Sequence, residues 1–183
     1  MPLTKLQAEG LNLADTFAFS GTVSGAGGGK VLQVVQGTSN YSFSTTSSSY
    51  VDVESSSGTT WETAITPSAT SSKILVQFNP SVTMQQNGAS SCRGTLKIME
   101  KIGSGSYGNM SNNSIQVQNM VGGYDYGGSG IQFRMRDLWS FLSSPNTTSE
   151  CKYKLQVTLS GGATTYINDS SEYGTVILTE IGA

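Results

Sequence analysis

Acidic side chains are the residues of this chain whose spacing comes closest to a reactive arrangement. Asp52 and Glu54 lie two positions apart, so they share one face of an extended segment. That spacing could seat a calcium ion or a pair of catalytic carboxylates. The alternative, which we favour, is a solvated strand face that discourages pairing with other sheets. The chain has no histidine, which excludes Ser-His-Asp and Cys-His catalysis, so we predict no catalytic residue and no enzymatic activity.

A glycine-rich stretch at residues 103–108 fits the G-x-G-x-x-G pattern and follows a predicted strand. A dinucleotide site needs a helix to begin directly after the glycines, whereas residues 109–114 are mostly Asn and Ser and are typical of a loop. We therefore predict a hairpin loop here, and neither a cofactor nor a metal site in the chain.

The chain has two cysteines, Cys92 and Cys151. They could form one disulfide across neighbouring strands, or they could be two small buried thiols. We favour the thiols, because no signal peptide or other feature marks the chain as secreted.

Tyrosines in glycine-rich loops are the best candidates for ligand contact. Tyr124, Asp125 and Tyr126 lie within the Gly-Gly-Tyr-Asp-Tyr-Gly-Gly run of residues 122–128, and Tyr107 lies in the 103–108 loop. Aromatic rings that stack on a sugar, together with a fixed carboxylate, would form a glycan-binding edge. The alternative is a loop packed on its own tyrosines or on a neighbouring subunit.

Basic residues occur in two alternating pairs, Arg134 with Arg136 and Lys152 with Lys154. If their strands were neighbours, they would form a small basic patch, for example for an acidic glycan. The alternative, which we favour, is that they serve only solubility.

Alternating polar and apolar residues predict strands along most of the chain. In residues 151–160 every odd position is apolar and every even one polar, which predicts a strand with one buried and one wet face. Residues 131–142 show a similar pattern, except that Asp137 falls on the apolar face and marks a bend or bulge there. Further strands are expected at residues 16–23, 31–36, 41–43, 50–54, 61–66, 73–79, 82–85, 95–102, 115–121, 164–167 and 175–181.

Short strands separated by Gly- and Ser-rich turns predict an all-β fold, an antiparallel β-sandwich or jelly roll. We expect the head domain to occupy residues 31–183, after a short extended N-terminal arm at residues 1–30. The arm cannot form a core alone, but its apolar residues could be buried when copies wind together or when it lies on a partner. These attachment residues are Leu3, Leu6, Leu11, Leu13, Phe17 and Phe19.

Charge and hydropathy exclude two classes of partner. The chain has 10 Lys and Arg against 12 Asp and Glu, so no basic surplus exists to neutralise a nucleic acid. No apolar stretch approaches the roughly 20 residues that span a bilayer, so we expect no membrane insertion. We expect a soluble protein made in a cytoplasm.

Several strings of this sequence resemble bacteriophage virion proteins, of a kind typical of marine phages and often described as tail-fibre-like. The similar strings lie at residues 18–25, 29–35, 43–53, 65–76, 141–148, 153–157 and 176–181. Residues 85–130 fit least well, and we expect host- or partner-specific loops there.

The resemblance implies a non-enzymatic, homotrimeric virion component that is assembled in the host cytoplasm. Its arm would dock on the particle, and its β head would face outward with receptor contact through the loops around Tyr107, Tyr124 and Tyr126. One alternative is a capsid decoration or head-fibre protein, and another is a free carbohydrate-binding module or adhesin. An enzyme is the class that we favour least.

Overall fold

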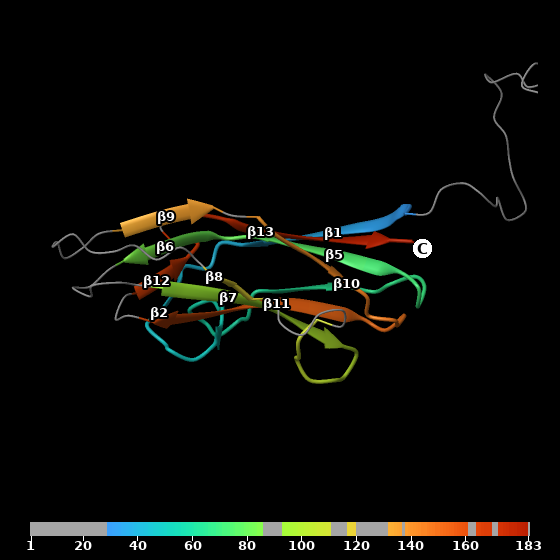
Figure 1. Cartoon of the computed structure of the whole chain (residues 1–183), viewed down its shortest axis with the longest axis horizontal. Coiled ribbons are helices and arrows are strands. Elements are labelled where there is room, and N and C mark those ends of the chain that lie inside the picture. Colours follow the sequence, from blue (N-terminus) through green and yellow to red (C-terminus); the bar gives the residue numbers. More distant parts are fainter. Residues whose placement is uncertain are drawn as a thin grey trace, which may run out of the picture.

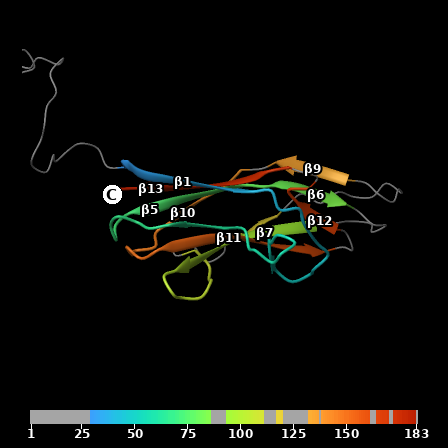
Figure 2. The same ribbon diagram turned by 180° about the vertical axis from the view of Figure 1, so that it is seen from behind.

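The computed structural model describes residues 29–85, 93–110, 117–119, 132–136, 138–160, 164–169 and 172–182. These residues form thirteen strands, all paired antiparallel, and they contain no helix. In particular, no helix in this part of the chain has the length and apolar character needed to cross a bilayer. The strands form two facing layers, which Figures 1 and 2 show from opposite sides.

The first layer, called the first sheet below, consists of two separately hydrogen-bonded four-stranded sheets whose strands follow one another in pairs along the chain. One half has the order β1-β13-β5-β10, and the other half has the order β2-β12-β6-β9. Pro80, which cannot donate a backbone hydrogen bond, separates β5 from β6. The strand bounds are Val31–Ser39 (β1), Gly174–Ile181 (β13), Lys73–Asn79 (β5), Trp139–Ser143 (β10), Phe43–Thr45 (β2), Thr164–Ile167 (β12), Ser81–Gln85 (β6) and Gln132–Arg136 (β9).

The second sheet has the order β3-β11-β7-β8, and β4 also pairs with β11, beside β3. Its longest contact is between β11 and β7, which pair over ten residues from Cys151↔Ile102 to Ser160↔Arg93. The bounds are Val51–Asp52 (β3), Glu62–Ile65 (β4), Arg93–Ile102 (β7), Val117–Asn119 (β8) and Cys151–Ser160 (β11).

The path of the chain between the two sheets is that of a jelly roll. It passes from β1–β2 in the first sheet to β3–β4 in the second, then to β5–β6, β7–β8, β9–β10, β11 and β12–β13, changing sheet at each step. Each sheet therefore has four strand positions, and neighbours in a sheet come from distant parts of the sequence. The predicted all-β sandwich is confirmed.

The core lies between the sheets and follows the predicted alternation. In β11 the odd residues Cys151, Tyr153, Leu155, Val157 and Leu159 are all buried. Together with the inner side chains of the neighbouring β7, and those of β5 and β13 in the opposite sheet, they form one hydrophobic core. The core also contains both tryptophans, one of which packs edge-on against a phenylalanine with ring centroids 5.4 Å apart (Trp61 and Phe78).

Two strand predictions need correction. Residues 131–142 do not form one strand, because β9 pairs with β6 whereas β10 pairs with β5. The interruption between β5 and β6 at Pro80 is thus matched by an interruption between β10 and β9, the strands hydrogen-bonded beside them. The strand predicted at residues 41–43 is displaced, since β2 covers Phe43–Thr45.

Other predictions can be compared with the structure only in part, because some of their residues lie outside the described part of the chain. Cys151 is a buried free thiol, and burial raises its pKa to about 11. Cys92 lies outside the described residues, as do the strand expected at 16–23 and all of the arm except residues 29 and 30. At the start of the described chain, Gly29 N donates to Gly182 O at 3.1 Å, so this point lies beside the end of β13.

Candidate functional site

The outer face of the second sheet carries paired charges. On β11, Lys154 Nζ lies 2.5 Å from Asp52 Oδ2, and Lys152 Nζ lies 2.9 Å from Glu62 Oε1. These lysines are on the wet face that the alternation of β11 predicts. Because each lysine has an acidic partner on β3 or β4, this face is a lattice of ion pairs, not a basic patch.

Tyr107, which we expect to contact a ligand, packs on this lattice. Its hydroxyl donates a hydrogen bond to Glu62, and Lys154 Nζ lies 4.1 Å from its ring centroid. Burial and the bond to Glu62 raise the pKa of Tyr107 far above its usual range. At Glu62, burial alone would raise the pKa of the carboxyl, but the hydrogen bonds from Tyr107 and Lys152 lower that pKa below its ordinary value. Tyr107 is thus tied to the second sheet, and its contact with a ligand remains a prediction.

The other predicted site residues lie outside the part of the chain that the structure describes, and their roles remain predictions. They are the loop residues Tyr124, Asp125 and Tyr126 and the arm residues Leu3, Leu6, Leu11, Leu13, Phe17 and Phe19.

A shallow depression of about 450 Å³ lies where the chain passes from β2 in the first sheet to β3 in the second. Tyr50, at its rim, is 38% exposed and has Lys97 Nζ 5.5 Å from its ring centroid. Asp52 accepts hydrogen bonds from Lys154 and, at 2.8 Å, from Gln156 Nε2. The lining residues are Phe43, Ser44, Thr45, Tyr50, Val51, Asp52, Glu54 and Gln156.

Sequence reasoning missed this depression as a site, although its signal was present. Tyr50, Asp52 and Glu54 alternate with the apolar Val51 and Val53, which places an aromatic ring and two carboxylates on one face. We favoured a solvated face for the two acids. What no local pattern reveals is that Gln156, about a hundred residues away, lies beside Asp52 in the sheet.

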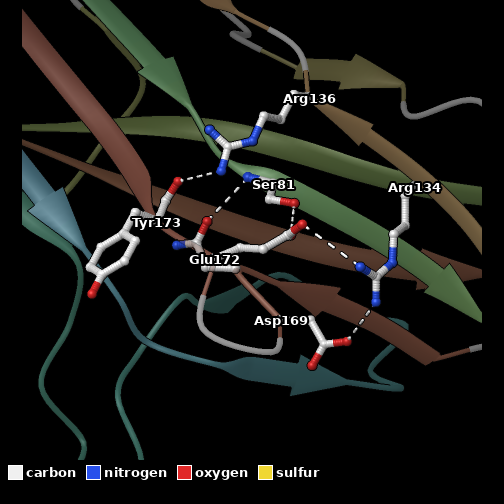
Figure 3. A network of polar contacts seen from close by, with 7 residues as sticks. Ser81, Arg134, Arg136, Asp169, Glu172 and Tyr173 are labelled. Atoms are coloured by element: carbon white, nitrogen blue, oxygen red, sulfur yellow. Dashed lines mark hydrogen bonds and ion pairs between the residues drawn. The ribbon is translucent and has the colours of Figure 1, made fainter.

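The hypothetical patch of Arg134, Arg136, Lys152 and Lys154 does not exist, because β9 and β11 belong to opposite sheets. Arg134 lies between Asp169 and Glu172, 3.6 Å and 3.7 Å from their carboxylates (Figure 3). Arg136 donates to the backbone oxygen of Tyr173 at 2.9 Å. The two arginines thus fasten β9 to the loop between β12 and β13.

The outer face of the β1-β13-β5-β10 half of the first sheet is almost uncharged, whereas the other half carries the exposed Arg134 and Arg136 on β9. Val34, Thr179, Leu75 and Leu142 form one row across β1, β13, β5 and β10, and Val34 and Leu142 are 60% and 37% exposed. The next row, Gln36, Ile177, Gln77 and Ser140, is neutral as well, and the one charged residue in the two adjoining rows is Lys73. The start of β1 adds exposed Val31 and Leu32 at the margin.

Two carboxylates are buried inside the sandwich, and sequence reasoning did not identify them. Glu100 on β7 accepts hydrogen bonds from Tyr153 at 2.8 Å and from Ser143 at 2.5 Å, which links the two sheets. Burial and the nearby Glu100 charge raise the pKa of Tyr153 well above its usual range. Glu180 on β13 accepts from Ser68 and Gln33. Both acids lie at positions of their strands where the alternation predicts a buried apolar residue. This departure from the pattern is the signal that could have revealed them.

The carboxylates of Asp52 and Glu54 do not act as an isolated pair. Asp52 is held by Lys154 and Gln156, and Glu54 accepts a hydrogen bond from Thr60 at 3.2 Å. Among the described residues, no three cysteine or acidic side chains gather closely enough to hold a metal ion.

Comparisons with known proteins give distant structural likenesses. No protein-family model and no curated protein matches the chain. It is similar to a chain in the structure of the infectious bursal disease virus Gx strain, with a TM-score of 0.35 and 13% identity over 82% of this chain and 37% of that one. For the VP2 subviral particle of the same virus the TM-score is 0.34, with 12% identity over 81% and 39%. This chain thus spans well under half the length of either, and its function must be argued from its own surfaces.

Proposed function

We propose that this chain is a non-enzymatic structural protein of a bacteriophage virion, a fibre-like or appendage module that presents a β head on the particle surface. The observation that carries the proposal is the outer face of the β1-β13-β5-β10 half of the first sheet. A broad sheet face with exposed Val34 and Leu142 and almost no charge is typical of a surface that another protein covers. An architectural protein needs such a face in order to assemble.

The resemblance to phage virion proteins supports the same proposal. Most of its strings fall on the framework of the jelly roll, in β1, β2, β5, β11 and β13. Jelly rolls occur in viral capsid and lectin domains, where packing two sheets together helps to protect their strand edges. The fold is therefore compatible with the proposed role.

The proposed assembly is a homotrimer. In this proposal residues 1–30 form an arm that fastens copies to each other or to other virion proteins, and residues 31–183 form the head. The head would be located on the virion after assembly in the host cytoplasm. The uncharged face and the arm would be the surfaces buried in the assembly.

Electron microscopy of the phage particle tests the proposal. We expect density for the jelly-roll head in an appendage that projects from the particle, with three-fold symmetry. Density on the capsid lattice instead would favour the alternative of a decoration or head-fibre protein. Absence of the chain from purified particles, shown by mass spectrometry, would contradict a virion role altogether.

A second candidate function, a carbohydrate-binding module or adhesin, has one specific observation in its favour. The depression beside Tyr50 combines an exposed ring with carboxylate, amide and hydroxyl groups. On a virion the same depression would contact a host surface glycan.

A further inference from the structure

We infer that the depression between β2, β3 and β11 binds a neutral saccharide. This inference rests on the second candidate function, which it deepens by naming the class of ligand, and it does not depend on the proposed structural role. The site comprises Tyr50, Asp52, Glu54, Gln156 and Ser44, all of which line the depression. Its volume of about 450 Å³ lies within the range of roughly 300–1,000 Å³ that small-molecule sites occupy.

The tyrosine supplies the apolar contact that a sugar ring needs. A pyranose presents a face of C–H groups, which packs against an aromatic ring while its hydroxyls remain free to make hydrogen bonds. Tyr50 is 38% exposed although the residues beside it in β3 are half-buried, so its ring stands at the rim of the depression. Phe43 and Val51 provide further apolar lining.

The polar groups are held in place before any ligand arrives. Asp52 is fixed by Lys154 Nζ at 2.5 Å and Gln156 Nε2 at 2.8 Å. A carboxylate with one hydrogen bond on each oxygen still has lone pairs for two sugar hydroxyls. The carbonyl oxygen of Gln156 and the hydroxyl of Ser44 make no hydrogen bond to any other described residue, which leaves them available to a ligand.

The loop that carries Tyr50 is anchored to the second sheet. Ser47 O accepts hydrogen bonds from Leu159 N at 2.8 Å and from Thr158 Oγ1 at 3.5 Å. The Ser47 hydroxyl also accepts from Ser49 N and donates to Ser49 O. A preformed site of this kind loses little conformational entropy when it binds.

Charge selects a neutral ligand over an acidic one. Asp52 and Glu54 both line the depression, and the lysine nearest to Asp52 is already paired with it and only 10% exposed. A sialylated or sulfated sugar would bring a further negative charge against these two carboxylates, and the cation at the rim, Lys97, lies over the Tyr50 ring with its Nζ 5.5 Å from the ring centroid. Neutral hydroxyls, in contrast, donate readily to carboxylate oxygens.

The test is binding of the full chain to an array of neutral hexose and N-acetylhexosamine oligosaccharides, alongside sialylated and sulfated versions of the same cores. We expect binding to neutral members, followed by affinity measurement by titration calorimetry. Tyr50→Ala should weaken binding by roughly tenfold or more, because the stacking face is lost, whereas Tyr50→Phe should stay within about threefold.

Two further variants complete the test. Glu54→Gln keeps the shape of the side chain and should weaken binding several-fold, since a carboxylate accepts more strongly than an amide. Tyr173→Ala is the matched control, because Tyr173, in the loop before β13, is 59% exposed and does not line the depression. Thermal unfolding of each variant establishes that it is folded.

An array without any neutral ligand, or with acidic ligands alone, would overturn the inference. So would neutral binding that Tyr50→Ala leaves unchanged while the variant is folded. None of these results bears on the assembly of the chain, so a failure here is distinguishable from a failure of the structural role.

Discussion

At the scale of single residues, the buried acids show how this sandwich is tied together. Glu180 Oε1 accepts from the backbone N–H and hydroxyl of Ser68 at 2.7 and 2.6 Å, and Oε2 accepts from Gln33 Nε2 at 2.7 Å. Gln33 also donates to Thr66 O. A single carboxylate therefore joins β1, β13 and the loop before β5.

The charge of Glu180 should make stability depend on pH. Burial alone would raise its pKa, but the hydrogen bonds from Ser68 and Gln33 outweigh burial and lower the pKa to about 2, below the ordinary 4.5. Its contribution is therefore present above pH 4.5 and is lost as the pH falls toward 2. We expect Glu180→Gln to reduce the free energy of unfolding by about 1–3 kcal/mol at pH 7.

Urea denaturation at several pH values checks this prediction. The difference between the wild type and Glu180→Gln should shrink as the pH falls through 4 and 3. Glu150→Gln is the control, because the side chain of Glu150 is 53% exposed and its ion pair with Lys152 is 4.0 Å long. A difference for Glu180→Gln that is constant with pH would show that the charge of Glu180 is not what stabilises the fold.

The hydroxyl of Tyr153 should contribute through its bond to Glu100. Tyr153→Phe keeps the buried ring but removes one donor from the Glu100 carboxylate, so we expect a loss of about 1–3 kcal/mol in the free energy of unfolding. Tyr166→Phe, which breaks a half-buried bond to Gln85, should cost less than about 1 kcal/mol. Equal costs for the two variants would contradict the role assigned to Glu100.

The candidate site illustrates which residue roles local pattern can predict. The alternation of Tyr50, Asp52 and Glu54 was visible in the sequence, and so was the wet face of β11. The partners were not, because the contact of Tyr107 with Glu62 and that of Asp52 with Gln156 join residues 45 and 104 positions apart. Such contacts arise from strand order, which no short window contains.

At the scale of elements, the first sheet is interrupted at matching places in neighbouring strands. β5 stops at Asn79 before Pro80, and β12 stops at Ile167 before Asn168, whose positive φ of 54° turns the chain. Asn168 Oδ1 accepts from Ser81 N at 3.1 Å, which joins the two interruptions. The turn is completed at Gly174, where β13 begins.

Gly174 should tolerate no side chain. A Cβ at this position would lie 2.4 Å from Cη2 of Trp61 and 2.7 Å from the amide of Asn168. Since both neighbours are buried, we expect Gly174→Ala to lower the free energy of unfolding by about 1–3 kcal/mol. Chemical denaturation measures the change, with Gly108→Ala as the control because nothing lies within 4 Å of a Cβ there. A neutral Gly174→Ala would show that the turn can shift away from Trp61.

The strands themselves were largely predictable. Residues 73–79, 151–160 and 164–167 were predicted with the bounds that the structure shows, because each alternates between a buried and an exposed face. The prediction failed at residues 131–142, where apolar alternation continues although the pairing partner changes from β6 to β5. That change depends on Pro80, more than fifty residues away in the sequence.

At the scale of the whole molecule, the two outer faces differ in chemistry. The second sheet exposes ion pairs such as Lys152 with Glu62, whereas the β1-β13-β5-β10 half of the first exposes Val34, Leu142 and uncharged polar residues. One face is thus suited to solvent and polar ligands, and the other to a protein partner. The proposed structural role depends on this difference.

Charges placed on the uncharged face should disrupt assembly without unfolding the chain. We expect Val34→Lys combined with Leu142→Lys to reduce the oligomer to single chains, because both side chains are exposed and would carry unpaired charge into the interface. Ser48→Lys combined with Ser57→Lys, in exposed loops, is the matched control and should leave the oligomer intact. Dissociation in both double variants, or in neither, would show that the interface lies elsewhere.

The mass of the unmodified full chain in solution, measured by light scattering at micromolar concentration, tests the central claim most directly. A self-assembling virion module predicts a monodisperse particle with the mass of three chains, each of 19.2 kDa. A stable particle with the mass of one chain, unchanged when residues 1–28 are removed, would contradict the account.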